Sequence, residues 1–297
     1  MSQKSFAFKL KVMNQAVVWV GIGIAVMFFA LIMLFAKGLH LGIDFTGGTN
    51  LLLRFDQVPQ IVTVRSAVSK SNIAEINRGT SIQYLGLEND ISIKTKMLTP
   101  NEVAELQKVL EKEVGKFKVM EISTIGATVG HELRQQSVWI ILMVTIALLA
   151  YISFRFQFFY GLAAIFALLH DGLLTIGFAA FTQMDVDLAF VAAVLTILGY
   201  SINDTIVIFD RLRENQANPQ PGETLIQIAN RSVSETLTRS INTVMTVLIV
   251  LVCLYLFGGS TVKDFNLVLL VGIGSGCYSS IFIATPLYVK LKEKFSK

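Results

Sequence analysis

The stretch LGYSINDTIVIFDR, from Leu198 to Arg211, decides the fold class of this chain. Almost all of it is apolar enough to lie inside a lipid bilayer, yet Asn203 and Asp204 stand side by side within it. A carboxylate in a membrane-spanning helix costs about 2.5–3.5 kcal/mol on insertion scales. A side chain that expensive is expected to be retained for a function.

The composition agrees with a membrane protein. Hydrophobic residues make up 53% of the 297 residues and charged residues only 15%, where a soluble domain carries about 25% charged residues. The mean hydropathy is +0.62, and lysines and arginines flanking apolar runs explain the pI of about 9.0. They are not interleaved with aromatic residues on a polar background, so no nucleic-acid binding is expected. Cys253 and Cys277 lie in apolar runs without metal-ligand or disulfide spacing, and we interpret them as packing residues.

Six apolar runs are long enough to cross the hydrocarbon core, which takes about 20 residues. They are Ala16–Ala36, Ser137–Phe154, Phe158–Thr182, Leu188–Phe209, Ile241–Phe257 and Phe265–Val289. The first run is longer than the core of a cleaved signal peptide, so we interpret it as a span. Gly272 and Gly276 in the last run have the small-xxx-small spacing that predicts a close helix contact.

Residues 37–136 have the charges, alternation and turn residues of a soluble domain. Strands are expected at Thr49–Phe55, Thr80–Gly86, Asn89–Thr95 and in the Lys116–Ser123 region, and a helix at Val58–Lys70. A second helix is expected after Thr99, because Thr99, Pro100 and Glu102 form a capping box. The order β-α-β-β-α-β is the ferredoxin-like arrangement. The predicted fold class is therefore a polytopic α-helical membrane protein with six transmembrane helices and one inserted α+β ferredoxin-like domain.

We predict three parts: residues 1–36 as the N-terminus and first span, 37–136 as the extracytoplasmic domain, and 137–297 as a five-helix transmembrane bundle. Residues 211–240 are expected to form an amphipathic connection, either at the inner membrane surface or as a partner-docking surface. The positive-inside rule places both termini in the cytoplasm. The basic residues that carry this prediction are Lys4, Lys9, Lys11, Arg155, Arg211, Arg213, Arg231, Arg239, Lys290, Lys292, Lys294 and Lys297.

Asp204 is the main functional candidate. Ser201, Asn203 and Thr205 give it a polar sector on an apolar helix, and it lies roughly 9 Å from the cytoplasmic end of the span at 1.5 Å per residue. Arg239 begins the next, antiparallel span and is expected to reach a similar depth. A carboxylate and a guanidinium so placed exchange a proton if the arginine moves away and returns. A static salt bridge, or an arginine that marks the inner face, is the alternative.

His170 and Asp171 form a second polar pair, in the third span. A polar contact between helices and a secondary role in proton access remain open for this pair. The sequence holds no catalytic triad, HExxH motif or phosphate-binding loop, so we expect neither an enzyme nor a cofactor.

Six motifs, taken in order and spacing, closely resemble the SecF family of bacterial protein-export membrane proteins, in the resistance–nodulation–division superfamily. They are GIDFTGGT (42–49), VGHELRQQS (129–137), ALLHDG (167–172), LGYSINDTIVIFDRLREN (198–215), TRSINT (238–243) and VLLVGIGSGCYSSIFIATP (268–286). The resemblance covers essentially the whole chain, and the fourth motif is the most specific.

The resemblance implies a subunit of the Sec translocase accessory complex in the bacterial plasma membrane, which uses the ion-motive force in late steps of protein export. Asp204 and Arg239 match the acid and the arginine of the family's ion pathway. The implied partners are a SecD-like second half, the SecYEG channel, the translocating preprotein and the lipid bilayer. Half of a small-molecule or lipid exporter and a non-transporting scaffold are the alternative functions, and the choice between H⁺ and Na⁺ stays open.

Overall fold

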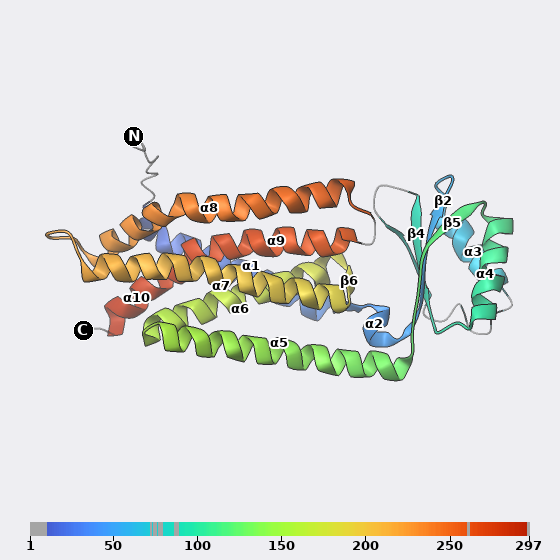
Figure 1. The fold of residues 1–297 in the computed structure, drawn as a ribbon, viewed down its shortest axis with the longest axis horizontal. Helices are drawn as coiled ribbons and strands as arrows, with labels where there is room; N and C mark the ends of the chain where they lie inside the picture. Colours follow the sequence, from blue (N-terminus) through green and yellow to red (C-terminus); the bar gives the residue numbers. More distant parts are fainter. Residues whose placement is uncertain are drawn as a thin grey trace.

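The computed structural model describes residues 11–71, 73, 76, 80–85, 89–259 and 262–295. Long helices lie side by side in an elongated bundle, and an α+β domain extends from one end of it (Figure 1). The described residues contain six helical segments long and apolar enough to cross a membrane, which confirms the predicted number of spans. The start of the first span and the last helix lie at the end opposite the domain (Figure 1).

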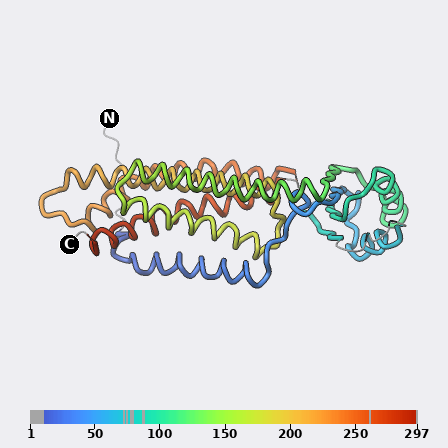
Figure 2. The backbone as a smooth tube through the Cα atoms, turned by 90° about the horizontal axis from the view of Figure 1, so that it is seen from below, coloured from blue at the N-terminus to red at the C-terminus, as the bar shows by residue number. Residues whose placement is uncertain are grey.

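Three of the spans form the inner part of the bundle and three the outer part. The inner helices are α6 (Phe158–Thr182), α7 (Leu188–Ala217) and α9 (Lys263–Ser279). The outer helices are α1 (Ala16–Lys37), α5 (Ala127–Arg155) and α8 (Leu225–Phe257). The spans that contain α6, α7 and α9 are 50%, 56% and 61% buried, against 11–17% for the other three. Figure 2 shows α1, in blue, along one flank of the bundle.

Small residues bring the inner helices together. A Cβ at Gly272 of α9 would lie 2.1 Å from Ile197 Cδ1 of α7, and one at Gly276 would lie 3.0 Å from Ser201 Cβ. These distances confirm the predicted close contact at this glycine pair.

The last span changes its winding part-way. After α9 comes a π-helical turn, η3 (Ser280–Ala284), and then α10 (Thr285–Phe295). Pro286 has no N–H to bond the carbonyl of Phe282, which removes one α-helical bond from this turn. The Thr285 hydroxyl donates to the carbonyl of Ser280 at 3.0 Å. Such π segments occur frequently at functional sites.

Two helices begin earlier than the predicted spans. α5 starts at Ala127, so the predicted division after residue 136 falls inside a helix and stays a prediction. α8 starts at Leu225 with a Thr224–Gln227 capping box and runs unbroken to Phe257. Its first turns bury Ile228 and Val233, and α8 packs along α7, so this part of the connection does not lie apart as a surface helix.

The α+β domain has the predicted ferredoxin-like order. Its elements are β2 (Gly48–Phe55), α3 (Ile61–Lys70), β3 (Ser81–Leu85), β4 (Asp90–Thr95), α4 (Pro100–Glu113) and β5 (Phe117–Ile125). The strands pair in the order β3-β4-β2-β5, all antiparallel. The capping box at Thr99 is present, and Leu51, Ile91, Leu106 and Leu110 are among the fully buried core residues. Gly86, the last residue of the predicted second strand, lies outside the described residues.

A short two-stranded pairing joins the domain to the bundle. β1 (His40–Leu41) follows α1 and pairs in parallel with β6 (Asp185–Val186), which precedes α7. The one-turn helix α2 (Ile43–Thr46) and two glycines with positive φ, Gly47 and Gly48, then lead into β2. A Cβ at Gly47 would lie 2.8 Å from the Cα of Ala127, so the chain needs glycine to pass this close to α5.

Candidate functional site

Asp204 lies on the side of α7 that packs against α8. Its side chain is buried, with 8% of the residue exposed, and its Oδ2 makes no hydrogen bond in the part of the chain that the structure describes. A buried polar atom without a partner is uncommon and carries a free-energy cost. The carboxylate therefore has one oxygen free for a ligand or a proton.

The groups around Asp204 come from α8 and α9. Arg239 and Ser240 of α8 lie close enough to act on its charge, and its charge in turn acts on the Cys277 thiol of α9. Arg239 is exposed and makes no ion pair within 4.0 Å among the described residues, and the buried hydroxyl of Ser240 is also without a partner. The structure thus brings Asp204 and Arg239 near each other without closing a salt bridge.

The other three residues of the predicted polar sector point elsewhere. Asn203 is exposed on the outer surface of the bundle. Ser201 points to α6 and α9, and Thr205 hydrogen-bonds Ser280 of η3 at 2.8 Å. No hydrogen bond joins any of the three to Asp204 in the described chain. Asn203 and Thr205 are adjacent to Asp204 and so point about 100° away from it around the helix axis, and the Ser201 hydroxyl bonds Asp171 instead.

Asp171 is the centre of a second polar cluster, which we call the Asp171 cluster: Asp171 with His170, Ser201, Ser275 and Ser279. The hydroxyls of Ser201 and Ser279 donate to Oδ2 at 2.6 Å each, and that of Ser275 donates to Oδ1 at 2.7 Å. The Nδ1 of His170 lies 3.0 Å from Oδ1. The cluster joins α6, α7 and α9 deep in the bundle, where Asp171 is fully buried.

Sequence reasoning found His170 and Asp171 but not the serines that surround them. Ser275 and Ser279 are four residues apart and so lie on one face of α9, which is a signal that the sequence did contain. Nothing in the sequence paired that face with Asp171, because the partner lies 104 residues away from Ser275.

Comparison with known protein families assigns the chain to one of them. The family described as "Protein export membrane protein SecD/SecF, C-terminal" matches residues 105–294, and the "SecD/SecF GG Motif" family matches residues 32–57. The first match alone covers more than half of the chain. The chain belongs to the SecD/SecF family.

Relatives of similar length narrow the assignment to one branch of the family. The protein translocase subunit SecF of Sebaldella termitidis is 39% identical over 292 residues, covering 97% of this chain and 93% of that protein. The SecF of Desulfurispirillum indicum is 39% identical over 275 residues, covering 90% and 86%. The chain is thus a SecF-type subunit of the Sec translocase accessory complex, and it acts in protein export, not as an enzyme.

The solved structures confirm the fold. The crystal structure of SecDF from Thermus thermophilus superposes with a TM-score of 0.86 at 33% identity, covering 95% of this chain. SecDF in the super-membrane-facing form gives a TM-score of 0.70 at 32% identity. The chain spans 38% of the Thermus SecDF chain, so it corresponds to one part of a larger assembly with SecD.

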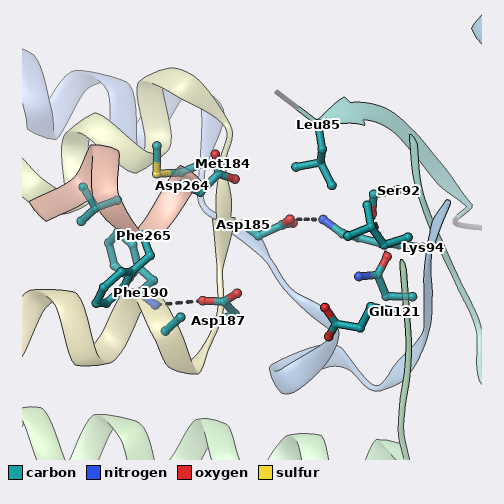
Figure 3. A pocket seen from close by; sticks show the side chains of 14 residues that line it. Leu85, Ser92, Lys94, Glu121, Met184, Asp185, Asp187, Phe190, Asp264 and Phe265 are labelled. Atoms are coloured by element: carbon teal, nitrogen blue, oxygen red, sulfur yellow. Dashed lines mark hydrogen bonds and ion pairs between the residues drawn. The ribbon is translucent and has the colours of Figure 1, made fainter. Parts of the chain in front are cut away.

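The seam between the α+β domain and the bundle holds a third charged group in this SecF-type chain. Asp185 of β6 forms an ion pair with Lys94 of β4, and its Oδ1 lies 3.0 Å from the Nδ1 of His40. Figure 3 shows Lys94 reaching from the sheet to Asp185 across a cavity of about 150 Å³, with Asp187 and Asp264 on the bundle side.

Burial shifts the pKa values of the ionisable groups at the seam. It lowers the pKa of Lys94, which the negative charges of Asp264 and Asp187 oppose. It also lowers the pKa of His40, and the nearby Lys94 adds to that shift. The pKa of Asp187 is raised, again mainly by burial. The seam therefore combines one buried cation with several acids.

An ion pair and an amide join α7 to α8 at the opposite end of the bundle, and further ion pairs lie within α7 and at the start of α8. Arg211 bonds Glu235 and Glu214 at 2.6 Å each. Arg231 bonds Glu223 at 2.8 Å, and Asn215 donates to the Ser232 hydroxyl at 2.9 Å. The charged face predicted for the start of α8 therefore includes contacts to α7.

Proposed function

We propose that this subunit couples the movement of a cation, H⁺ or Na⁺, to late steps of protein export, and that Asp204 takes up and releases the ion. The observation behind the proposal is the unpartnered Oδ2 of a buried carboxylate in a membrane span. Ionisable residues at such depth are by default candidates for an ion pathway, because a structural role is met more cheaply by a neutral side chain.

Arg239 lies near Asp204 without forming an ion pair, which supports ion exchange at Asp204 rather than a static salt bridge. A closed bidentate bridge would satisfy both carboxylate oxygens and hold the charge permanently. Here the guanidinium lies beyond 4.0 Å and is exposed, while still acting on Asp204 electrostatically. Such an arginine moves in when the carboxylate is ionised and moves away when the carboxylate binds its ion.

The polar groups on the outside of α7 and α8 support a second membrane half as the partner. Asn203 on α7 and Arg239, Asn242 and Thr243 on α8 are exposed along two apolar spans. The Thr243 hydroxyl bonds the carbonyl of Arg239 within the helix, but lipid would offer no hydrogen-bond partner to Asn203, Arg239 and Asn242, so a protein surface is expected to cover them. A SecD-like half with its own membrane-embedded acid is the proposed partner, beside the SecYEG channel and the emerging preprotein.

The charges at the two ends of the bundle support an orientation with both termini in the cytoplasm of a bacterial plasma membrane. Arg155, Arg211 and Arg231 lie at the end opposite the domain, at helix ends and in the α7–α8 region. Positive loops remain on the cytoplasmic side. Lys4, Lys9 and Lys297, which also entered the prediction, lie outside the described residues.

The test is Asp204→Asn in cells that depend on this subunit. The amide keeps the size of the side chain but does not titrate, so export is expected to fall to the level of a strain lacking the subunit at unchanged protein abundance. Asp210→Asn is the matched control, because Asp210 lies on the same helix in a half-exposed pair with Arg155. ATP-driven translocation without an ion gradient should be little affected.

Normal export by Asp204→Asn at wild-type abundance would refute the coupling role and leave a structural polar contact. Arg239→Lys is expected to impair export, since a compact ammonium does not replace a planar guanidinium. Repeating the assay with a proton or a sodium gradient alone distinguishes the two ions.

A further inference from the structure

We propose that Asp171 is a positioning residue, which fixes the rotation of α7 so that Asp204 faces α8. The functional meaning of this inference rests on the ion-coupling role proposed for Asp204. The geometric part of the inference, that Asp171 orients α7, does not depend on that role, and the two parts are tested separately.

The contact lengths indicate that Asp171 is held firmly at both oxygens. The three serine hydroxyls lie at 2.6–2.7 Å from its two oxygens. Hydrogen bonds between a hydroxyl and an oxygen acceptor are typically about 2.7–2.8 Å long, so these three are at the short end of the range. With the Nδ1–H tautomer, His170 is a fourth donor at 3.0 Å. Both oxygens are thus fully used, so Asp171 has no free lone pair comparable to the Oδ2 of Asp204.

Ser201 is the residue through which Asp171 contacts α7. It is the only member of the Asp171 cluster on that helix; Ser275 and Ser279 belong to α9 and His170 to α6. Ser201 precedes Asp204 by three residues, which places the two side chains about 60° apart around the helix axis. A bond that keeps Ser201 facing α6 and α9 therefore keeps Asp204 turned towards α8.

Thr205 makes a second hydrogen bond that restrains the rotation of the same helix. Its hydroxyl bonds that of Ser280 at 2.8 Å, at the first residue of the π-helical turn. Asp204 thus lies between Ser201, whose hydroxyl bonds Asp171 of α6, and Thr205, whose hydroxyl bonds Ser280 of the last span. A Cβ added at Gly276 would lie 3.0 Å from the Cβ of Ser201, so α7 and α9 are also in close contact at this level.

The experiment measures which way position 204 faces. Cysteines are introduced as Asp204→Cys and Ser240→Cys in a Cys253→Ser, Cys277→Ser background, and oxidative cross-linking is measured in the folded, detergent-purified chain. Rapid cross-linking is expected with Asp171 intact. Asp171→Asn removes the charge that orients three donors and should reduce cross-linking by about fivefold or more, the equilibrium factor that corresponds to one lost hydrogen bond.

Two serine variants keep the test decisive if Asp171→Asn does not fold. Ser201→Ala releases α7 from the cluster, and cross-linking should fall. Ser275→Ala removes an equivalent donor from the same carboxylate but leaves α7 attached, so cross-linking should stay near the wild-type rate. Equal effects of the two variants, or unchanged cross-linking in folded Asp171→Asn, would overturn the proposal.

The outcome is independent of the coupling test. A general loss of stability lowers the amount of folded protein but does not change the facing of position 204 within the folded fraction. If Asp204→Asn exports normally while Ser201→Ala still reduces cross-linking, the positioning stands and the coupling role fails. If both tests succeed, export by the Ser201→Ala chain should also be impaired.

Discussion

Asp171 in the inner bundle and Asp185 at the seam are both carboxylates that need partners for their oxygens. Each carboxylate lies 3.0 Å from the Nδ1 of a histidine, and each joins three elements of the chain. Asp171, deep in the bundle, is held by three neutral hydroxyls. Asp185, at the seam, is held by the charged Lys94.

The difference follows from the surroundings. A second full charge in a dry interior costs more to desolvate than its attraction returns, whereas serine hydroxyls stabilise the carboxylate at little cost. The seam lies at the end of the spans beside a cavity lined by a lysine and several acids, where opposite charges attract each other. The inner region should therefore depend on packing, and the seam on charge and pH.

Enlarging an inner glycine should produce the largest effect. Gly272→Leu places a side chain where Ile197 already lies, at 2.1 Å from the position of a Cβ. Overpacking of this kind costs about 1–3 kcal/mol or more, and it would separate α9 from α7 beside the Asp171 cluster. Thermal unfolding in detergent should show a clearly lower midpoint.

Gly274→Leu is the control for this prediction. It adds the same side chain two residues further along α9, where no atom lies within 4 Å of the added Cβ. Equal midpoints for the two variants would show that the inner helices are not closely packed at this point.

Removing the charge at the seam should have an intermediate effect. Asp185→Asn leaves Lys94, only 13% exposed, without its ion-pair partner. An unsatisfied charged donor costs about 1–3 kcal/mol, so the domain should hold less tightly to the bundle. Hydrogen exchange in β1 and β6 should become faster.

The double variant Asp185→Asn, Lys94→Gln should recover part of the loss, because it leaves no charge unpaired. Glu113→Gln is the control. It breaks the exposed Lys70–Glu113 pair within the domain, which should matter little. A double variant that exchanges as fast as Asp185→Asn alone would exclude the ion pair as the cause.

Local signals predicted the elements well. The lengths of the apolar runs gave six spans, because a bilayer requires that length whatever the neighbours are. Thr99, Pro100 and Glu102 gave the start of α4, because a capping box is made within one turn. The alternation of strands and helices gave the ferredoxin-like order, which the strand pairing confirms.

Contacts between distant segments were harder to predict. The sequence pattern grouped Ser201, Thr205 and Asp204 into one polar sector. The fold turns Ser201 towards Asp171 of α6, Thr205 towards Ser280 of η3 and Asp204 towards α8. The helix periodicity places a residue on a face but does not say which helix meets that face. Lys94 and Asp185 are 91 residues apart and meet only when the domain docks, so no local pattern pairs them.

The pH dependence of the seam should be the smallest effect. Burial and Lys94 lower the pKa of His40, so the docked seam favours neutral histidine. As the pH falls through the ordinary histidine value of about 6.5 towards the lowered pKa, the undocked state binds more protons than the docked state, and docking weakens. The side chain is 35% exposed, so the change should stay below about 1 kcal/mol. It should appear as faster hydrogen exchange in β1 and β6 at about pH 5.5 than at about pH 7.5, after correction for the intrinsic exchange rate.

His40→Gln separates this contribution from that of the acids. Asp187 has a raised pKa, so the docked state binds its proton more readily, and acid strengthens docking through Asp187 in the range just above the ordinary aspartate value. The two groups therefore act with opposite signs. Removing His40 should abolish the weakening of docking on mild acidification. Any strengthening of docking by protonation of Asp187 should then become measurable. If docking in His40→Gln weakens on acidification as much as in the wild-type chain, the histidine does not set the pH response. The comparison with the Asp171 cluster, whose hydroxyl donors are neutral, must then rest on the Lys94–Asp185 pair alone.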